Sequence, residues 1–272
     1  MSADPSEALS GPLSAALGAG EPAALVTLAE ARGSTPREAG AAMLVMPGRV
    51  AGTIGGGTYE WAGIARARRL LASGEGAAAL SLPLGPETGQ CCGGHVTLAI
   101  ARADARTLAA LRAREAEAAA RAPLVIIYGA GHVGRALALA LDPLPFRMRI
   151  VDDRPEEIAR VSSTRAAREA GPAGAVAGSA PPGAAHVVAT HSHALDSLIC
   201  AGLLEANRFA YLGLIGSATK RATFLGAFRA MGLDEAALAR LVCPIGGTPV
   251  RDKRPAVIAA LVAAELIAVF AT

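Results

Sequence analysis

The amino-acid sequence predicts an α/β protein with a doubly wound parallel sheet in its C-terminal part and a smaller N-terminal α/β domain with a mixed sheet. Three observations lead to this prediction. After Pro123, short apolar runs alternate with helical segments, the pattern of a parallel sheet. The first of these runs enters a glycine motif at residues 129–134. Before residue 104, glycine-rich turns separate shorter strands. We therefore place the domains at residues 1–103 and 123–272, joined by a helical connector over residues 104–122.

The N-terminal elements are predicted from apolar spacing and from the positions of the glycines. Apolar residues at short intervals indicate strands, and a recurrence every three or four residues after Thr58 indicates a helix. Glycine clusters mark the turns. In chain order we expect a strand at 23–29, a turn at 33–37, a strand at 43–46, a glycine loop at 52–57, a helix at 58–72, a cysteine-bearing turn at 89–94 and a strand at 96–100.

The C-terminal elements are predicted from apolar strands that are each followed by a helix. The first strand spans residues 124–128, and the glycine motif then begins a helix. Further strands are expected at 146–151, 186–190, 210–215 and, more briefly, 242–244, while residues 161–183 show no clear pattern. The apolar stretch 255–272 is interrupted by Glu265. A membrane span needs roughly 20 apolar residues, so we expect a buried helix there.

Composition argues against several classes of partner and location. The chain has 26 Lys and Arg against 23 Asp and Glu, and these charges form no basic stripe, so nucleic acid is not an expected partner. The first residues lack the basic and apolar regions of a signal peptide, and we expect no membrane association. Four cysteines in 272 residues do not make a disulfide framework, which favours a reducing cytoplasm.

The glycine motif at residues 129–134 has the spacing of a dinucleotide-binding, Rossmann-like turn. Gly129, Gly131 and Gly134 would allow a tight turn and leave the helix N-terminus open to a phosphate. Asp152 follows 18 residues after the last glycine and could bind ribose hydroxyls, which would favour NAD over NADP. Another phosphate-bearing ligand fits the same turn, and glycines kept only for packing are a third interpretation.

The N-terminal glycine loop offers the same physics. Gly55, Gly56 and Gly57 precede a helix start that could bind an anion, and Arg37 could add charge-assisted hydrogen bonds. An ordinary tight turn with an exposed arginine is the alternative. Glu60 fits an acid at a helix start better than a catalyst.

Two further candidate sites follow strands of the predicted parallel sheet. His191 and His193, with Asp196 nearby, could bind a metal, contact a ligand, transfer protons or cap a helix. Ser217 is a candidate N-cap whose helix start could face an anion, together with Lys220 and Arg221. A solvated basic face is the alternative for these two cations.

The cysteines divide into two kinds. Cys91 and Cys92 are adjacent and lie between glycines, where core packing does not require thiols. Glycine on both sides lets another molecule approach the backbone, and thiolates suit soft metals and metal–sulfur centres. We therefore predict that this segment holds a ligand, with Cys91 and Cys92 as candidate metal ligands. A disulfide between the two neighbours is the alternative, but it would be strained. Cys200 fits an apolar helix, and packing is also favoured for Cys243.

Taken in the order in which they occur along the chain, the motifs resemble those of the xanthine dehydrogenase accessory protein (XdhC/CoxI) family. The resemblance runs from about residue 24 to the C-terminus, and it rests on the segments 33–37, 52–57, 89–94, 129–134, 152–155, 190–193 and 213–217. Ala42 departs from it, since the family usually has a lysine there. Ala218 and Thr219 depart as well, since basic residues often stand there.

The resemblance implies a chaperone that binds the molybdenum cofactor, molybdopterin, protects it, supports its sulfuration and inserts it into apo-xanthine dehydrogenase. The implied partners are that apoenzyme, a cysteine desulfurase and the enzymes of cofactor synthesis, and we expect a homo-oligomer. Such a chaperone would have no turnover of its own. The alternatives are an NAD-dependent oxidoreductase, with Asp152 on the ribose and a histidine moving protons, and a docking protein without bound pterin.

Overall fold

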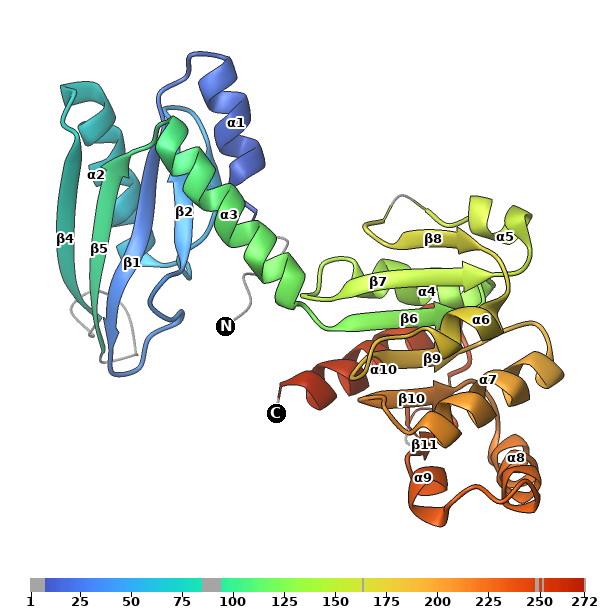
Figure 1. Ribbon diagram of the computed structural model, residues 1–272. Coiled ribbons are helices and arrows are strands. Elements are labelled where there is room, and N and C mark those ends of the chain that lie inside the picture. Colours follow the sequence, from blue (N-terminus) through green and yellow to red (C-terminus); the bar gives the residue numbers. More distant parts are fainter. Residues whose placement is uncertain (1–7, 85–93, 163, 248–249, 251, 272) are drawn as a thin grey trace. The chain divides into compact units, whose positions relative to one another are not determined.

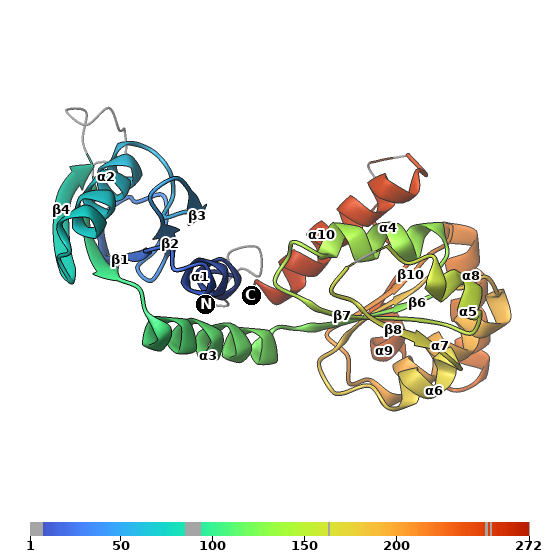
Figure 2. The ribbon, with the colours of Figure 1, turned by 90° about the horizontal axis from the view of Figure 1, so that it is seen from above.

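The structure is a computed structural model that describes residues 8–84, 94–162, 164–247, 250 and 252–271. The chain divides into two compact units, one ending at Ala120 and one beginning at Arg121. Each unit is a sheet with helices on both faces (Figures 1 and 2). The predicted α/β class, with a parallel sheet in the C-terminal part, is confirmed.

The sheet of the first unit is antiparallel in every described pair, which corrects the expected mixed sheet. Its order is β3-β2-β1-β5-β4, from β1 Ala24–Arg32, β2 Ala42–Val45, β3 Val50–Gly52, β4 Ala77–Leu84 and β5 Gly94–Arg102. Parallel neighbours need a long crossover, usually a helix. The helix α2, Thr58–Ser73, joins β3 to β4, and these strands lie at opposite edges of the sheet.

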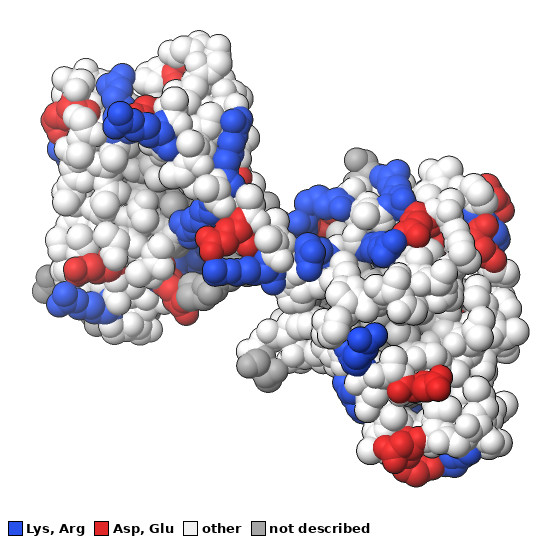
Figure 3. All heavy atoms as spheres, viewed as in Figure 1, with Lys and Arg blue, Asp and Glu red and all other residues white. Residues whose placement is uncertain are grey.

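Helices cover both faces of this first sheet. On one face α2 packs its buried Leu70 against Val26 and Leu98. On the other face, Leu13 of α1, Ser10–Gly18, and Leu111 of α3, Ala105–Arg121, pack against the sheet. The carboxylate of Glu115 on α3 accepts hydrogen bonds of 2.9 Å from the N–H groups of Leu9 and Ser10 and so caps α1. The predicted connector helix therefore packs on the first unit, and the surface along it carries charges of both signs (Figure 3).

The predicted motifs of this unit lie together at one end of the strands of the first sheet. Because β1, β3 and β4 run in the same direction, their carboxyl ends lie at a common edge. The turn at 33–37 follows β1, and the glycine loop follows β3. Leu84 and Gly94, which flank the cysteine-bearing segment, are paired at this edge too.

The second unit contains a six-stranded parallel sheet of order β11-β10-β9-β6-β7-β8. The strands are β6 Leu124–Tyr128, β7 Arg147–Asp152, β8 Ala167–Ala170, β9 Ala185–Val188, β10 Tyr211–Leu214 and β11 Leu241–Val242. Numbered from its own first strand, this is the Rossmann order 3-2-1-4-5-6. The strand order reverses between β6 and β9, and ligands of such sheets bind at this point, outside the carboxyl ends.

Helices again cover both faces of the second sheet. One face packs against α4 His132–Leu141, α5 Pro155–Ala159 and α10 Pro255–Phe270. The other packs against α6 Ala173–Gly178, α7 His193–Ala206, α8 Ala218–Ala230 and α9 Glu235–Ala239. The unassigned stretch 161–183 holds β8 and α6, while α1, β3 and β4 were not predicted. Among the described residues, no helix combines the length and apolar character that crossing a bilayer requires.

Candidate functional site

The glycines after β6 form the centre of the candidate site, and each has its own structural reason. Gly129 has φ +107°, and a Cβ there would lie 2.2 Å from the carbonyl oxygen of Ala189. A Cβ at Gly134 would lie 1.9 Å from the carbonyl oxygen of Gly129, so α4 packs on the strand only with glycine here. A Cβ at Gly131 would meet nothing within 4 Å. Gly129 and Gly134 thus serve the fold, whereas Gly131 borders open space.

The start of α4 presents backbone donors toward this open space. Gly131 is the N-cap residue and gives α4 no side-chain cap. The N–H groups of Gly131, His132 and Val133 have no hydrogen-bond partner within the described part of the chain. Free N–H groups at a helix N-terminus favour an anion, and a bare Gly131 leaves room for it. This arrangement fits the phosphate of a bound ligand.

Asp152 ends β7 beside this turn and is held by the chain itself. Its Oδ2 accepts from the N–H of Ala130 at 2.7 Å and from Nη2 of Arg154 at 2.9 Å. Its Oδ1 accepts from the backbone N–H and from Nε of Arg154, at 3.0 and 2.9 Å. Burial alone would raise the pKa of Asp152, but these hydrogen bonds outweigh it and lower the pKa to about 2. Arg154 was not among the predicted site residues, although an arginine two residues after an acid at a strand end was the available signal.

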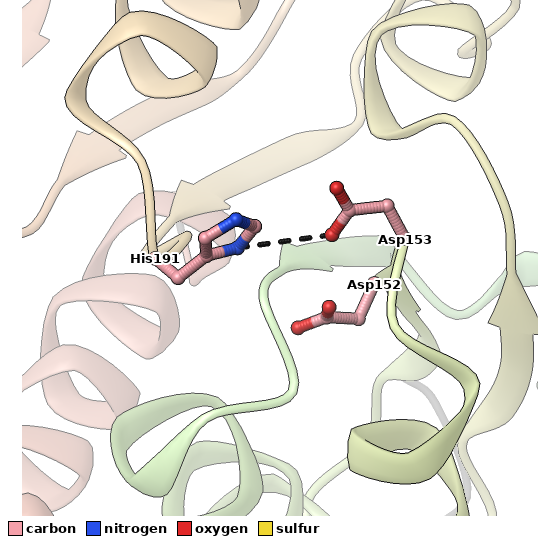
Figure 4. Close-up of side chains that lie close together, drawn as sticks. All are labelled: Asp152, Asp153 and His191. Carbon is pink, nitrogen blue, oxygen red and sulfur yellow. Dashed lines mark ion pairs between the residues drawn. The ribbon is translucent and has the colours of Figure 1, made fainter.

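His191 lies across the turn from the end of β7. Its Nδ1 is 3.7 Å from Oδ1 of Asp153, toward which the imidazole is turned (Figure 4). Asp152, Asp153 and His191 bring possible ligand atoms within 4.8 Å of one another. Because Arg154 already pairs with Asp152, this group has a cation in place and only Asp153 and His191 remain exposed. His193 begins α7 as an exposed residue, outside this group.

Ser217 and Lys220 lie at the neighbouring helix start, and both are used within the fold. Ser217 is the N-cap of α8 and accepts from the N–H of Lys220 at 3.2 Å. The ammonium of Lys220 binds the buried Asp196 at 2.6 Å and the carbonyl of Ile215 at 2.9 Å. Asp196 also accepts from the N–H of Thr190 at 3.1 Å, so this ion pair fixes the loops after β9 and β10. Arg221 is half-buried in the first turn of α8.

Cys200 and Cys243 are buried, as the packing interpretation predicted. Burial raises the pKa of each thiol above its usual value, although Lys220 opposes this for both. Neither is therefore set up as a thiolate.

In the first unit, the glycine loop already holds an anion that belongs to the chain. Oε2 of Glu60 accepts hydrogen bonds from the N–H of Ile54 at 2.9 Å, from the N–H of Gly56 at 3.1 Å and from the hydroxyl of Thr53 at 2.5 Å. Burial raises the pKa of Glu60, but these donors outweigh it, and the pKa is lowered. Glu60 stands three residues after the N-cap Gly57, the position from which an acid reaches back over a helix start.

Arg37 lies against this same loop. A Cβ at Gly55, where φ is +122°, would lie 2.8 Å from Cγ of Arg37. The structure thus brings together the predicted Arg37 and Gly55, with Gly56 and Gly57 following at φ +76° and +80°. Cys91 and Cys92, the predicted metal ligands, lie outside the described residues.

Fold and site together define a two-unit α/β protein with a Rossmann-type parallel sheet in its second unit. Comparison with protein families agrees with this and is more specific. A model described as the XdhC Rossmann domain matches residues 125–266, and one described as the XdhC and CoxI family matches residues 16–83. The chain belongs to the XdhC and CoxI family, as its seven motifs predicted.

Two individual proteins are similar to this chain. The chain is 29% identical over 258 residues to the uncharacterized protein YqeB of Escherichia coli strain K12. That match covers 91% of this chain but 43% of YqeB, so the chain spans less than half the length of this relative. It also resembles a crystal structure described as a xanthine dehydrogenase from Bacillus halodurans, with a TM-score of 0.77 and 18% identity over 96% of this chain and 95% of the other. At that identity the likeness shows the fold.

Proposed function

We propose that this chain is an accessory protein that binds the molybdenum cofactor and delivers it to an apo-xanthine dehydrogenase. The observation that carries the proposal is the start of α4, where N–H groups that have no partner among the described residues face the open space at Gly131. Molybdopterin carries a phosphate, and such a helix start suits a phosphate. Membership of the XdhC and CoxI family favours this ligand over other phosphate esters.

The chain's own residues would then have distinct roles. The N–H groups of Gly131, His132 and Val133 would hold the phosphate, while Gly129 and Gly134 keep the turn in shape. When bound, the cofactor would supply a molybdenum centre with sulfur ligands, to which the thiolates of Cys91 and Cys92 are chemically suited. Protection of the cofactor, support of its sulfuration by a cysteine desulfurase and its insertion into the apoenzyme belong to the same proposal.

The test is the pterin content of protein isolated without oxygen. The full chain is purified anaerobically, its ligand is oxidised, and the released pterin is measured by fluorescence. Gly131→Glu places a carboxylate in the space at the start of α4 and should remove most of the pterin. Gly202→Glu on α7 is the matched control, because it adds the same charge at a glycine with nothing within 4 Å of its Cβ position.

Two results would contradict the proposal. One is wild-type protein with no more pterin than an unrelated protein from the same cells. The other is a folded Gly131→Glu variant that retains as much pterin as Gly202→Glu. Activation of purified apo-xanthine dehydrogenase by the loaded chain then tests delivery, and Cys91→Ala and Cys92→Ala test the thiolates.

A further inference from the structure

Rossmann-type sheets that bind dinucleotides recognise the ribose with a free acid at the end of the second strand. Asp152 occupies this position, at the end of β7 and next to the turn at Gly129. The question is therefore whether its carboxylate can accept hydrogen bonds from a ribose.

The acceptor capacity of Asp152 is already used. A carboxylate has about four lone-pair sites. Four donors of the chain lie between 2.7 and 3.0 Å from its two oxygens: Nε, Nη2 and the backbone N–H of Arg154, and the N–H of Ala130. The Asp152 side chain is 1% exposed. A ribose hydroxyl would therefore find no free lone pair on the Asp152 carboxylate, and the burial of this side chain would keep the hydroxyl away from it.

Arg154 gives this position the opposite chemistry. Its guanidinium makes a bidentate ion pair with the carboxylate, a geometry that binds more strongly than a single contact. The Arg154 side chain remains 32% exposed, and its Nη1 group has no partner within the described residues. The same Oδ2 binds both Arg154 and Ala130, so the cation stands beside the turn that leads into α4. A ligand at this turn therefore meets N–H donors and a positive charge, and not a carboxylate that could accept hydrogen bonds from its hydroxyls.

We infer that Arg154 is a specificity-determining residue. By occupying the carboxylate of Asp152 it prevents recognition of a ribose, and it restricts the site to phosphate-bearing ligands that are bound without hydrogen bonds to ribose hydroxyls. The inference rests on the proposed function, because it narrows the ligand class of the same site. The site would thus bind the phosphate of a pterin and exclude NAD.

The test is fluorescence titration of the full chain with NADH. Wild-type protein should bind NADH weakly. Arg154→Ala should bind it roughly tenfold more tightly or better, because Asp152 regains for the ribose hydroxyls the two acceptor sites that Nε and Nη2 of Arg154 occupy. Arg154→Ala combined with Asp152→Asn should lose this gain. Arg160→Ala is the matched control, since it removes an exposed arginine that pairs with Glu157 and should titrate like wild type.

The inference is overturned if wild type already binds NADH as tightly as Arg154→Ala, or if folded Arg154→Ala gains no affinity. Should the alanine variant fail to fold, Arg154→Lys replaces it, because lysine keeps the charge but lacks the two-pronged geometry. The titration requires no bound cofactor. Absence of pterin from wild-type protein would therefore count against the proposed function while the NADH result still decides the role of Arg154.

Discussion

Acidification should destabilise the second unit through one buried histidine. His186 lies on β9 and is 2% exposed, and its Nδ1 is 2.9 Å from the hydroxyl of Tyr128. The two rings stack with their centroids 5.8 Å apart, and Phe209 packs edge-on against the imidazole. Burial lowers the pKa of His186 from 6.5 to about 4. The imidazole is therefore neutral in the folded protein at pH 7.

The direction of this pH effect follows from the pKa of His186, which is higher in the unfolded chain than in the folded protein. Below pH 6.5 the unfolded chain takes up a proton at His186, whereas the folded protein does so only near pH 4. Stability contributed by this group is thus fully present above pH 6.5 and is lost as the pH falls through this range. With these values the loss is about 2 kcal/mol at pH 5 and about 3 kcal/mol at pH 4. For a unit of this size, each kcal/mol lowers the melting temperature by roughly 2–4 °C.

The assay compares wild type with His186→Asn between pH 7 and pH 5. Asparagine keeps an acceptor for the Tyr128 hydroxyl but does not titrate, so the difference between the two proteins cancels the other ionisable groups. The variant should be less stable at pH 7, because it leaves a cavity, yet its stability should fall less on acidification. Hydrogen exchange of β6 and β9 assigns the change to the second unit.

Parallel pH dependence of the two proteins would refute this reasoning. So would a nuclear magnetic resonance titration in which the His186 imidazole of the folded protein protonates near pH 6.5. The range above pH 5 also separates His186 from Asp152, whose lowered pKa affects stability mainly between about pH 4 and pH 2.

Three further substitutions test other contacts. Gly134→Ala should cost at least about 2 kcal/mol in chemical denaturation, because its Cβ would overlap the carbonyl oxygen of Gly129; an unchanged midpoint would contradict that geometry. Lys220→Met should cost about 3 kcal/mol by leaving the Asp196 carboxylate buried without its cation, and adding Asp196→Asn should recover part of the loss. Glu60→Ala should lower the melting temperature and raise its sensitivity to millimolar phosphate above that of wild type, measured by thermal shift, since it frees the donors of the glycine loop; the same phosphate sensitivity in both proteins would exclude this exchange.

The strands and helices that the sequence predicted well are those in which local pattern and tertiary environment agree. Residues 124–128 form an apolar run, and the corresponding strand is buried along nearly its whole length. The missed elements lack such a signal. The strand β8 reads Ala-Arg-Glu-Ala and is mostly exposed at an edge of its sheet. The strand β4 is also an edge strand. It begins with three alanines and has a proline near its end, and its residues alternate between exposed and half-buried. Edge strands owe their position to pairing with a neighbour, which the sequence of the strand itself does not encode.

The candidate site was predictable in its residue types but not in its pairings. Sequence spacing correctly suggested that Gly129, Gly131 and Asp152 lie at one sheet edge. It did not reveal that Arg154 folds back onto Asp152, because such a contact depends on the direction in which the chain leaves β7. The same limitation applies to Lys220, which looked like a free cation in the sequence but binds Asp196 from another helix.

The two glycine loops show why motif and function have to be argued separately. Both precede a helix, and from the sequence both were candidate anion sites. In the first unit Glu60 binds the N–H groups of Ile54 and Gly56, so a phosphate there would have to displace a carboxylate whose lowered pKa keeps it charged. In the second unit no described side chain occupies the N–H groups at the start of α4. If the chain binds a phosphate-bearing cofactor, the second unit therefore supplies the cheaper phosphate site, because nothing has to be expelled from it.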